Sequence, residues 1–299
     1  MIAFGASMTS PEAYAQFAEP GVRRAMESDS QLFAHQAAGS IFRTYNLILD
    51  EAGAHDDLEA LVLVHQDAEI DDASLCGKLR RALADPDVGV VGCLGATGVG
   101  SIAWWEGSVS GGGAAYRYGE ASGGEMPVAA WGGDPGAAPR TGEVEAISGF
   151  LMALSPWVVR NVRFDEALGT QHGFDVDFCF AVRAAGRKVV TADLRVLHHH
   201  SLDLVTRNKP WIAAHMRVAD KWERRNGIPE PDWRQRARRA EAEAALARLV
   251  VEARQRERDA LAASQKRRLA QVTDTLSWRV TEPLRLLNAR RRARRAEAS

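Results

Sequence analysis

The sequence changes abruptly from apolar to polar residues at His65, Gln66 and Asp67. The apolar run before them, from Ala60 to Val64, has the composition of a strand buried on both faces. Ligands of open α/β sheets bind at the carboxyl ends of the strands, so Asp67 stands where a site is expected. Its carboxylate can hold a divalent metal that bridges a diphosphate, and the alternative is a strand-end aspartate that caps the next helix.

A second group of polar residues lies at Asp175 and Asp177, at the predicted N-terminus of a helix. Acidic residues are ordinary capping residues there, so a structural role competes with a chemical one. The loop before them, residues 170–173, contains His172 and is polar enough to admit an acceptor. Gly149, in an earlier strand-like segment, permits the close approach of a ligand. Together these features favour a site.

The third group is a run of histidines, His198, His199 and His200, after an apolar segment. In an extended chain, His198 and His200 face one side and His199 the other. Histidines at a strand end suit contact with a metal or a diphosphate. The alternative for any one of them is a core histidine satisfied by hydrogen bonds.

The elements that position these groups follow an α/β pattern from Met1 to about His200. Amphipathic helices are predicted at residues 37–50 and 72–83. The sequence predicts a mainly parallel sheet flanked by helices, with strands at residues 2–6, 60–65, 88–93, 144–154 and 188–192.

A glycine-rich stretch from Gly95 to Gly142 interrupts this pattern and contains several aromatic residues, among them Trp104 and Trp105. Such a long loop inside a domain is uncommon unless it is functional or disordered. The aromatic rings there either stack on a sugar or form a small core under the loop.

The charge divides the chain into two parts. Residues 1–233 carry 20 Lys and Arg against 31 Asp and Glu, a net charge of −11, whereas residues 234–299 carry 18 against 8, a net charge of +10. We therefore expect a domain at residues 1–226 and a basic helical or coiled-coil tail at residues 232–299. Three widely spaced cysteines and the lack of an apolar run of about 18 residues predict a cytoplasmic protein that does not span a membrane.

Taken together, these motifs resemble the inverting glycosyltransferases of the large family 2 group, in particular a bacterial branch with a His-Gln-Asp motif. The resemblance covers about residues 1–205. It implies a GT-A fold, a nucleoside-diphosphate sugar as donor, and Mg²⁺ or Mn²⁺ as cofactor. The motifs that carry it are Ser40 with Tyr45-Asn46, His65-Gln66-Asp67, Gly92 to Gly100 followed by Trp104-Trp105, Ser148-Gly149, Asp175-Val176-Asp177 and His198-His199.

The resemblance also assigns roles to individual residues. It implies that Asp67 is the last acid of a metal-binding pair, that His198 completes the metal site, and that Asp175 is the catalytic base. His65 occupies the place of the first acid, and a site with one fewer carboxylate binds a hard cation less tightly. The expected donor-binding residues are Thr9, Ser10, Ser40, Asn46, Gln66 and Asp67, and the expected acceptor-binding residues are Trp104, Trp105, Gly149, His172 and Asp177.

The implied reaction is an inverting transfer of a sugar to a hydroxyl of a glycan or lipid-linked acceptor, in bacterial surface polysaccharide or glycoconjugate synthesis. The competing interpretation is a non-catalytic nucleotide-sugar-binding or scaffolding protein that uses its coiled tail. Nucleic-acid binding is disfavoured, and a dinucleotide-binding dehydrogenase is disfavoured because no Gly-x-Gly-x-x-Gly follows the first strand.

The end of the tail combines Trp278 and several leucines with arginines, and it resembles a segment appended to many bacterial sugar transferases. Such a segment can lie in a lipid headgroup layer, which predicts peripheral contact with the inner face of the plasma membrane. The alternatives are a solvated helix end and a homo-oligomer formed through the thin apolar stripe of the tail.

Overall fold

A computed structural model describes residues 1–37, 39–99, 108–118, 125–127, 141–200, 208–225, 232–273 and 281. Its centre is a seven-stranded sheet in the order β2-β1-β3-β11-β5-β12-β9. Five of these strands run in one direction, and β11 and β9 run in the other. The strands are β1 (Ile2–Met8), β2 (Gln31–Gln36), β3 (Ala60–His65), β5 (Val88–Gly92), β9 (Gly142–Val144), β11 (Leu151–Leu154) and β12 (Lys188–Thr191).

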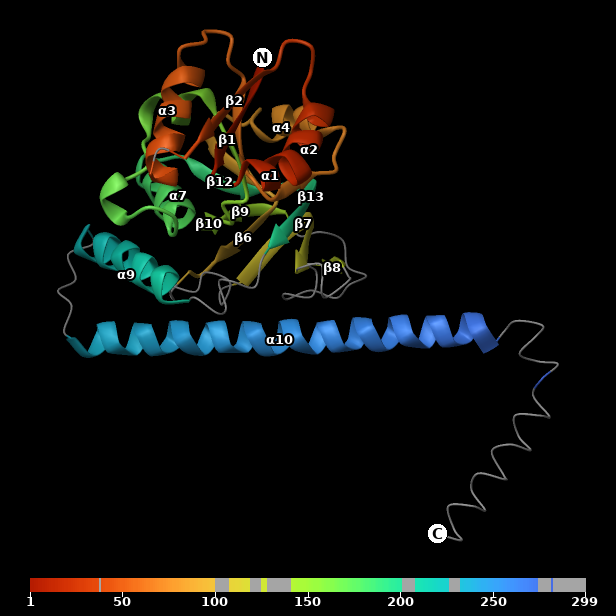
Figure 1. Ribbon diagram of the computed structural model, residues 1–299. Helices are drawn as coiled ribbons and strands as arrows, with labels where there is room; N and C mark the ends of the chain where they lie inside the picture. Colours follow the sequence, from red (N-terminus) through yellow and green to blue (C-terminus); the bar gives the residue numbers. More distant parts are fainter. Residues whose placement is uncertain are drawn as a thin grey trace.

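A second sheet lies across the carboxyl ends of the first, in the order β10-β6-β7-β13-β4, with β8 paired to β7 (Figure 1). Its strand β13 pairs antiparallel with β4, so that His198 lies opposite Ala68. This pairing brings the histidine run next to the turn that follows β3. The strands are β4 (Ala68–Ile70), β6 (Leu94–Thr97), β7 (Ser108–Tyr118), β8 (Glu125–Pro127), β10 (Ala146–Ile147) and β13 (Asp193–His200).

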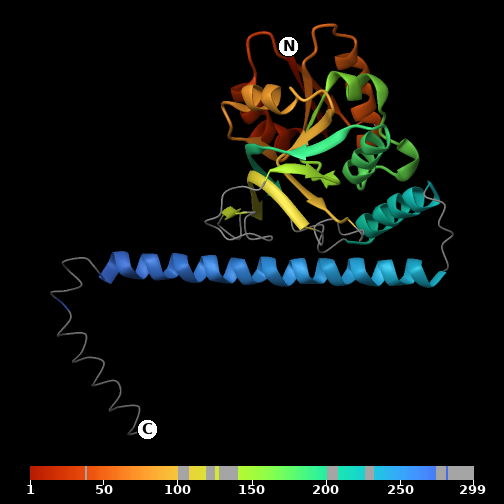
Figure 2. The same cartoon turned by 180° about the vertical axis from the view of Figure 1, so that it is seen from behind.

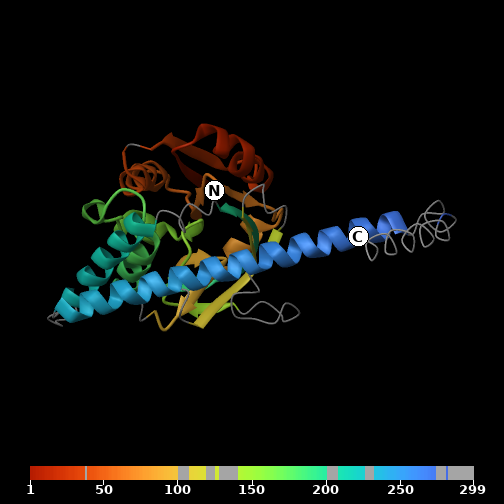
Figure 3. The same cartoon turned by 60° about the horizontal axis from the view of Figure 1, so that its bottom comes forward.

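Helices cover both faces of the main sheet. α3 packs with α6 on one face, and α2 and α4 lie on the other (Figures 1 and 3). α3 fits its place because Phe42, Tyr45, Ile48 and Leu49 recur at helical spacing and are all buried. The helices are α1 (Pro11–Ala13), the π-helix η1 (Tyr14–Ala18), α2 (Glu19–Ala25), α3 (Ile41–Gly53), α4 (Leu75–Ala82), α6 (Pro156–Asn161), the 3₁₀-helix η4 (Glu166–Leu168), α7 (Phe174–Ala184), α9 (Asn208–Arg225) and α10 (Asp232–Thr273).

The predicted α/β class, with a mixed, mainly parallel sheet flanked by helices, is confirmed. The strand expected at residues 144–154 is wrong, because the chain divides there into the end of β9, β10 and β11. A turn at Gly149 carries it from the second sheet into the first. The helices expected at 37–50 and 72–83 begin later, at Ile41 and Leu75.

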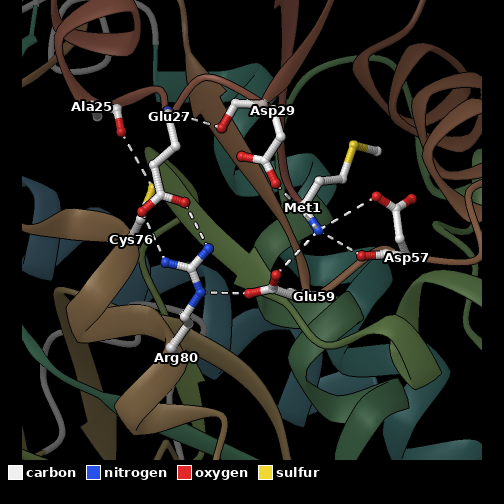
Figure 4. A network of polar contacts seen from close by, with 9 residues as sticks. Met1, Ala25, Glu27, Asp29, Asp57, Glu59, Cys76 and Arg80 are labelled. Atoms are coloured by element: carbon white, nitrogen blue, oxygen red, sulfur yellow. Dashed lines mark hydrogen bonds and ion pairs between the residues drawn. The ribbon is translucent and has the colours of Figure 1, made fainter.

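An ionic network ties the amino ends of β1 and β3 to α4, at the far end of the sheet from Asp67 (Figure 4). The ammonium of Met1 donates to the carbonyl oxygen of Asp57 at 2.6 Å and to Glu59 at 3.1 Å. Arg80 of α4 donates to both carboxylate oxygens of Glu27, at 2.8 and 2.6 Å, and also to Glu59. Bidentate arginine pairs of this kind fix orientation as well as charge.

The tail begins as the predicted long helix. α10 packs against α9 through Trp211, Ile212, Ala242 and Ala245 and then runs past the domain as one straight element (Figures 1 and 2). Farther along, Val251, Leu261 and Leu269 are exposed. A helix that spans a bilayer needs about 20 mostly apolar residues, and the described part of the chain contains none.

Candidate active site

The turn that follows β3 places Asp67 between two imidazoles. Asp67 Oδ1 accepts a hydrogen bond from Nδ1 of His65 and lies 3.1 Å from Nε2 of His198. The backbone supports this position, because the amide of His199 donates to the carbonyl of Asp67 at 2.8 Å. Phe150 stacks on the ring of His198 with 4.8 Å between ring centroids and so fixes its plane.

The electrostatics of this group depend on the close contact of one anion with two histidines. Burial alone would raise the pKa of Asp67, but the charge and hydrogen bond of His65 and the hydrogen bond of His198 outweigh it and hold that pKa far below its usual range. For His65, burial lowers the pKa, and the Asp67 carboxylate more than offsets this, so the pKa is raised. For His198, burial prevails and the pKa is lowered.

The same three residues form a group of ligand atoms that could hold a metal. One ligand atom from each of His65, Asp67 and His198 lies within 4.8 Å of the others. Two imidazole nitrogens and one carboxylate suit a divalent first-row transition metal better than Mg²⁺, which prefers oxygen ligands. The residues present therefore fit a divalent metal, and their chemistry is softer than that of a pair of carboxylates.

Asp175 lies in the first turn of α7 and is oriented by two backbone amides. Its Oδ2 accepts from Gly149 at 2.9 Å, and its Oδ1 accepts from Val176 at 3.0 Å. Burial raises the pKa of this carboxyl group, and the two amide donors offset the effect only in part. A carboxylate with a raised pKa is better suited to accept a proton near neutral pH than an exposed one.

Gly149 has a structural role that the sequence did not indicate. A Cβ at this position would lie 2.5 Å from Cζ of Phe174 and 2.8 Å from Cβ of Asp175. The missing side chain therefore leaves room for the first turn of α7, and acceptor binding at Gly149 stays a prediction.

The charges of Asp175 and of the Asp67 group affect the same buried side chains. The charge of His65 lowers the pKa of Asp175 against the effect of burial. Tyr45 of α3 is fully buried, and its pKa is raised first by burial and then by the charges of Asp67 and Asp175. Both charges thus act on the Tyr45 hydroxyl, an arrangement that the sequence did not indicate beyond the Tyr45-Asn46 pair.

Thr9, Ser10 and Gln66 form a second predicted group that the structure brings together. Gln66 Oε1 accepts from the backbone amides of Thr9 at 2.7 Å and Ser10 at 2.9 Å, and Gln66 Nε2 donates to Thr9 Oγ1 at 2.8 Å. Ser10 also caps α1 by accepting from the amide of Ala13 at 3.2 Å. Gln66 therefore holds the loop after β1 beside Asp67.

Ser40 and Asn46 make contacts that hold the loop before α7. Ser40 Oγ donates to the carbonyl of Gly169 at 3.2 Å. The carboxamide of Asn46 accepts from the amide of Phe164 at 2.9 Å and donates to its carbonyl at 3.0 Å. These bonds occupy the Asn46 carboxamide and fix the backbone of Phe164. Donor binding by Ser40 and Asn46 stays a prediction.

Asp177 is buried and held by α9. Its side chain is 1% exposed and accepts from Lys221 and Trp222 of α9. This carboxylate is turned away from solvent and both its oxygens are engaged, which does not favour acceptor binding; that role of Asp177 stays a prediction. His172 fits the expectation better: it is half-buried in the loop before Asp175, and burial first, then the charge of His65, lower its pKa.

His199 faces away from His198, as an extended chain predicts. Its Nε2 lies 2.9 Å from Glu69 Oε2, and its ring stacks on Phe17 of η1 with 4.0 Å between centroids. Glu69 and Phe17 were not indicated by the sequence. Trp104 and Trp105 lie outside the described residues.

Residues 22–228 match the model of a family described as "Glycosyltransferase like family". The chain belongs to this glycosyltransferase family. Over 204 residues, 67% of each chain, it is 29% identical to the streptomycin biosynthesis protein StrF of Streptomyces griseus. Family membership and the mixed sheet agree with the GT-A fold that the sequence resemblance implies.

This glycosyltransferase is also similar to solved structures at low sequence identity. The mannosyltransferase PcManGT of Pyrobaculum calidifontis, in complex with GDP-Man and Mn²⁺, gives a TM-score of 0.43 at 12% identity, with 93% of this chain and 82% of that chain covered. GalNAc-T7 with UDP, GalNAc and Mn²⁺ gives a TM-score of 0.47 at 9% identity, with 74% of this chain and 47% of that chain covered.

Proposed function

We propose that this glycosyltransferase moves a sugar from a nucleoside-diphosphate donor to a hydroxyl of a glycan or lipid-linked acceptor, with inversion at the anomeric carbon. One observation supports the proposal most strongly. A donor set of one carboxylate and two imidazoles, Asp67, His65 and His198, is complemented by a separately oriented carboxylate, Asp175, and the charges of Asp67 and Asp175 act on the same buried hydroxyl of Tyr45. A displacement at an anomeric carbon needs these two functions on opposite sides of the sugar.

Asp175 accepts the proton of the attacking hydroxyl in this proposal. Its carboxylate is held by the amides of Gly149 and Val176, so little motion is needed when the proton arrives. The acceptor enters past the loop that carries His172, which is half-buried and whose pKa is lowered by burial. A single displacement by the activated hydroxyl inverts the configuration, by the geometric logic that separates inverting from retaining glycosidases.

The donor diphosphate lies against the other group. His65, Asp67 and His198 would hold a divalent metal, and such a metal neutralises charge on a departing diphosphate. The two imidazoles favour Mn²⁺ over Mg²⁺. Thr9 and Ser10, in the loop fixed by Gln66, flank this place and contact the nucleotide.

The experiment that tests the reaction is release of nucleoside diphosphate from a panel of nucleotide sugars with Mn²⁺ or Mg²⁺, followed by NMR of the product anomer. The variant Asp175→Asn should keep the affinity for nucleoside diphosphate and lose turnover by about a hundredfold or more. Asp85→Asn, at an exposed carboxylate in the turn before β5, is the matched control and should retain full turnover. Undiminished turnover of Asp175→Asn would remove it from the mechanism, and a retained anomer would exclude single displacement.

In this proposal the tail brings the enzyme to the membrane surface. Its basic charge and the Trp278 segment would attach the enzyme to anionic lipid, where lipid-linked acceptors are concentrated. An alternative use of α10 is pairing with a second copy through its exposed Val251, Leu261 and Leu269. Flotation with anionic vesicles separates the two uses, because pairing does not require lipid.

A further inference from the structure

Asp177 is anchored from a helix distant in the sequence. The ammonium of Lys221 lies 2.7 Å from Asp177 Oδ1 and 2.9 Å from Oδ2, and the indole of Trp222 donates to Oδ1 at 2.8 Å. Burial raises the pKa of Asp177, and the charge and hydrogen bonds from α9 act against that effect. This buried carboxylate therefore depends on α9 for its partners.

The same ammonium holds the start of the loop that leads to α7. Lys221 Nζ lies 2.8 Å from Asp165 Oδ2, and Asp165 caps η4 by accepting from the amide of Ala167 at 3.1 Å. One turn earlier in α9, Nε of Arg217 donates to the carbonyl of Leu168 at 2.6 Å. Lys221 thus joins the two ends of residues 165–177, and Arg217 holds their middle.

α9 also lies directly against the residue that starts α7. Gly173 has a φ of +82°, and a Cβ there would lie 2.9 Å from Cγ2 of Val218. The amide of Asp177 donates to the carbonyl of Gly173 at 3.1 Å and closes the first turn of the helix. Asp175 lies inside this turn, between the two residues that α9 contacts.

We propose that Lys221 is a positioning residue for Asp175. Its ammonium, held between Asp165 and Asp177, fixes the first turn of α7 and so sets where the Asp175 carboxylate lies relative to Gly149. The inference rests on the proposed role of Asp175 as the base. It makes α9 a part of the catalytic unit rather than a connection to the tail.

The physical reason is the cost of an unpaired buried charge. Without Lys221, the carboxylate of Asp177 keeps the hydrogen bond from Trp222 but loses its cation. A buried anion without a counter-charge is strongly unfavourable, so the carboxylate takes up a proton or turns toward solvent. Either change alters the turn that contains Asp175. A displacement of about 1 Å at a reacting group can lower turnover about a hundredfold.

The amide of Gly149 reports the position of Asp175 without any substrate. It donates to Asp175 Oδ2, and Gly149 is far from Lys221 in the sequence. The NMR resonance of this amide therefore reports the position of the Asp175 carboxylate rather than the substitution itself. We would compare full-length protein labelled with ¹⁵N-glycine in four forms: wild type, Lys221→Met, Lys221→Arg and Lys209→Met. Lys209 is an exposed lysine at the start of the same helix and serves as the control.

We expect Lys221→Met to shift the resonances of Gly149 and Gly173, and Lys221→Arg, which keeps the cation, to shift them much less. With the nucleotide sugar found in the donor panel, Lys221→Met should lower kcat at least about tenfold and leave the KM for the donor within about twofold, and the arginine variant should recover most of the loss. Trp222→Phe removes one hydrogen bond to Asp177 and provides a milder version if Lys221→Met does not fold.

Two results would overturn the inference. If the Gly149 resonance of Lys221→Met does not shift, the ion pairs of Lys221 with Asp165 and Asp177 do not position Asp175. If the resonance shifts but kcat is unchanged, the ion pairs of Lys221 affect the structure of this turn and not the reaction. If the wild type turns over no nucleotide sugar, the proposed function fails, and the glycine spectra still decide whether Lys221 positions Asp175.

Discussion

Gly149 offers the most direct test of how the structure positions its proposed base. The substitution Gly149→Ala adds one methyl group at a place where Cζ and Cε2 of Phe174 would lie 2.5 and 2.6 Å away and Cβ of Asp175 2.8 Å away. Real Cβ atoms do not make contacts this short, so one partner must move. Phe174 packs against Phe42, Tyr45 and Phe164 and has little room to yield.

Because this ring has little room to turn aside by itself, the first turn of α7, which carries both Phe174 and Asp175, is the part that moves. To restore an ordinary separation of about 3.5 Å or more between carbon atoms, it must retreat by about 1 Å, and the hydrogen bond from Gly149 to Asp175, now 2.9 Å, lengthens with it. We expect kcat to fall about a hundredfold, equivalent to about 2.7 kcal/mol in the barrier. Overpacking should also cost about 1–3 kcal/mol of folding free energy.

The measurement is turnover of the donor sugar beside urea unfolding and nucleoside-diphosphate binding. Binding should change little, because the substitution does not touch His65, Asp67 or His198. Gly77→Ala is the matched control: it adds the same methyl group in α4, where the nearest atom is 3.7 Å away, and should stabilise the protein by about 0.5–1 kcal/mol. Turnover of Gly149→Ala within twofold of the wild type would refute the claim that this close contact sets the position of Asp175.

Further predictions concern the metal group, the pH dependence and the tail. Asp67→Ala should abolish the dependence of nucleoside-diphosphate binding on Mn²⁺ in calorimetry, and equal affinity with and without metal in the wild type would reassign Asp67 to a structural cap. Because burial raises the pKa of Asp175, kcat should begin to fall at a higher pH than the value of about 3.9 for a free aspartate would give, as protonation removes the base. Burial lowers the pKa of His215 to about 4, so its contribution to stability should be present above about pH 6.5 and lost as the pH falls toward 4, by up to about 3 kcal/mol in unfolding experiments, and His215→Gln should lack this loss. Removal of residues 272–299 should release the protein from anionic vesicles at low salt and leave turnover with a soluble acceptor unchanged, whereas an intact protein that fails to float would contradict membrane attachment.

The sequence predicted those elements whose burial is uniform. β3 has the expected bounds, Ala60–His65, because its residues up to Val64 are all buried and its end coincides with a change in polarity. β2 was missed because it is an edge strand whose residues are half-buried or exposed, and such a strand has no strong apolar pattern. The break at Gly149 was hidden because β10 and β11 belong to different sheets yet are equally apolar.

For the site, the residue types were predictable and the pairings were not. Asp67 and His198 were both expected at strand ends, but their contact depends on the antiparallel register of β13 with β4, which a sequence pattern does not specify. Asp175 and Asp177 point in different directions and have different partners because residues two apart in a helix do not lie on the same face. That rule was available from the sequence and argued against two acids acting at one site. The partner of Asp177, Lys221, lies 44 residues away and gave no signal.

The two aspartates of the proposed site carry opposite perturbations, and the difference matches the two roles. Asp67 is held as a permanent anion, because two histidines bond it and keep its pKa far below the usual range. For Asp175, burial outweighs the hydrogen bonds from backbone amides and the charge of His65, so its pKa is raised and it takes up a proton more readily than a free aspartate. A fixed charge suits the side of the reaction where diphosphate and metal are held, and a titratable carboxylate suits the side where a hydroxyl loses its proton. The environment of each aspartate, rather than the residue type, therefore determines its role. A cation placed beside Asp175 should lower its pKa, so that the carboxylate stays ionised but no longer accepts a proton as a base.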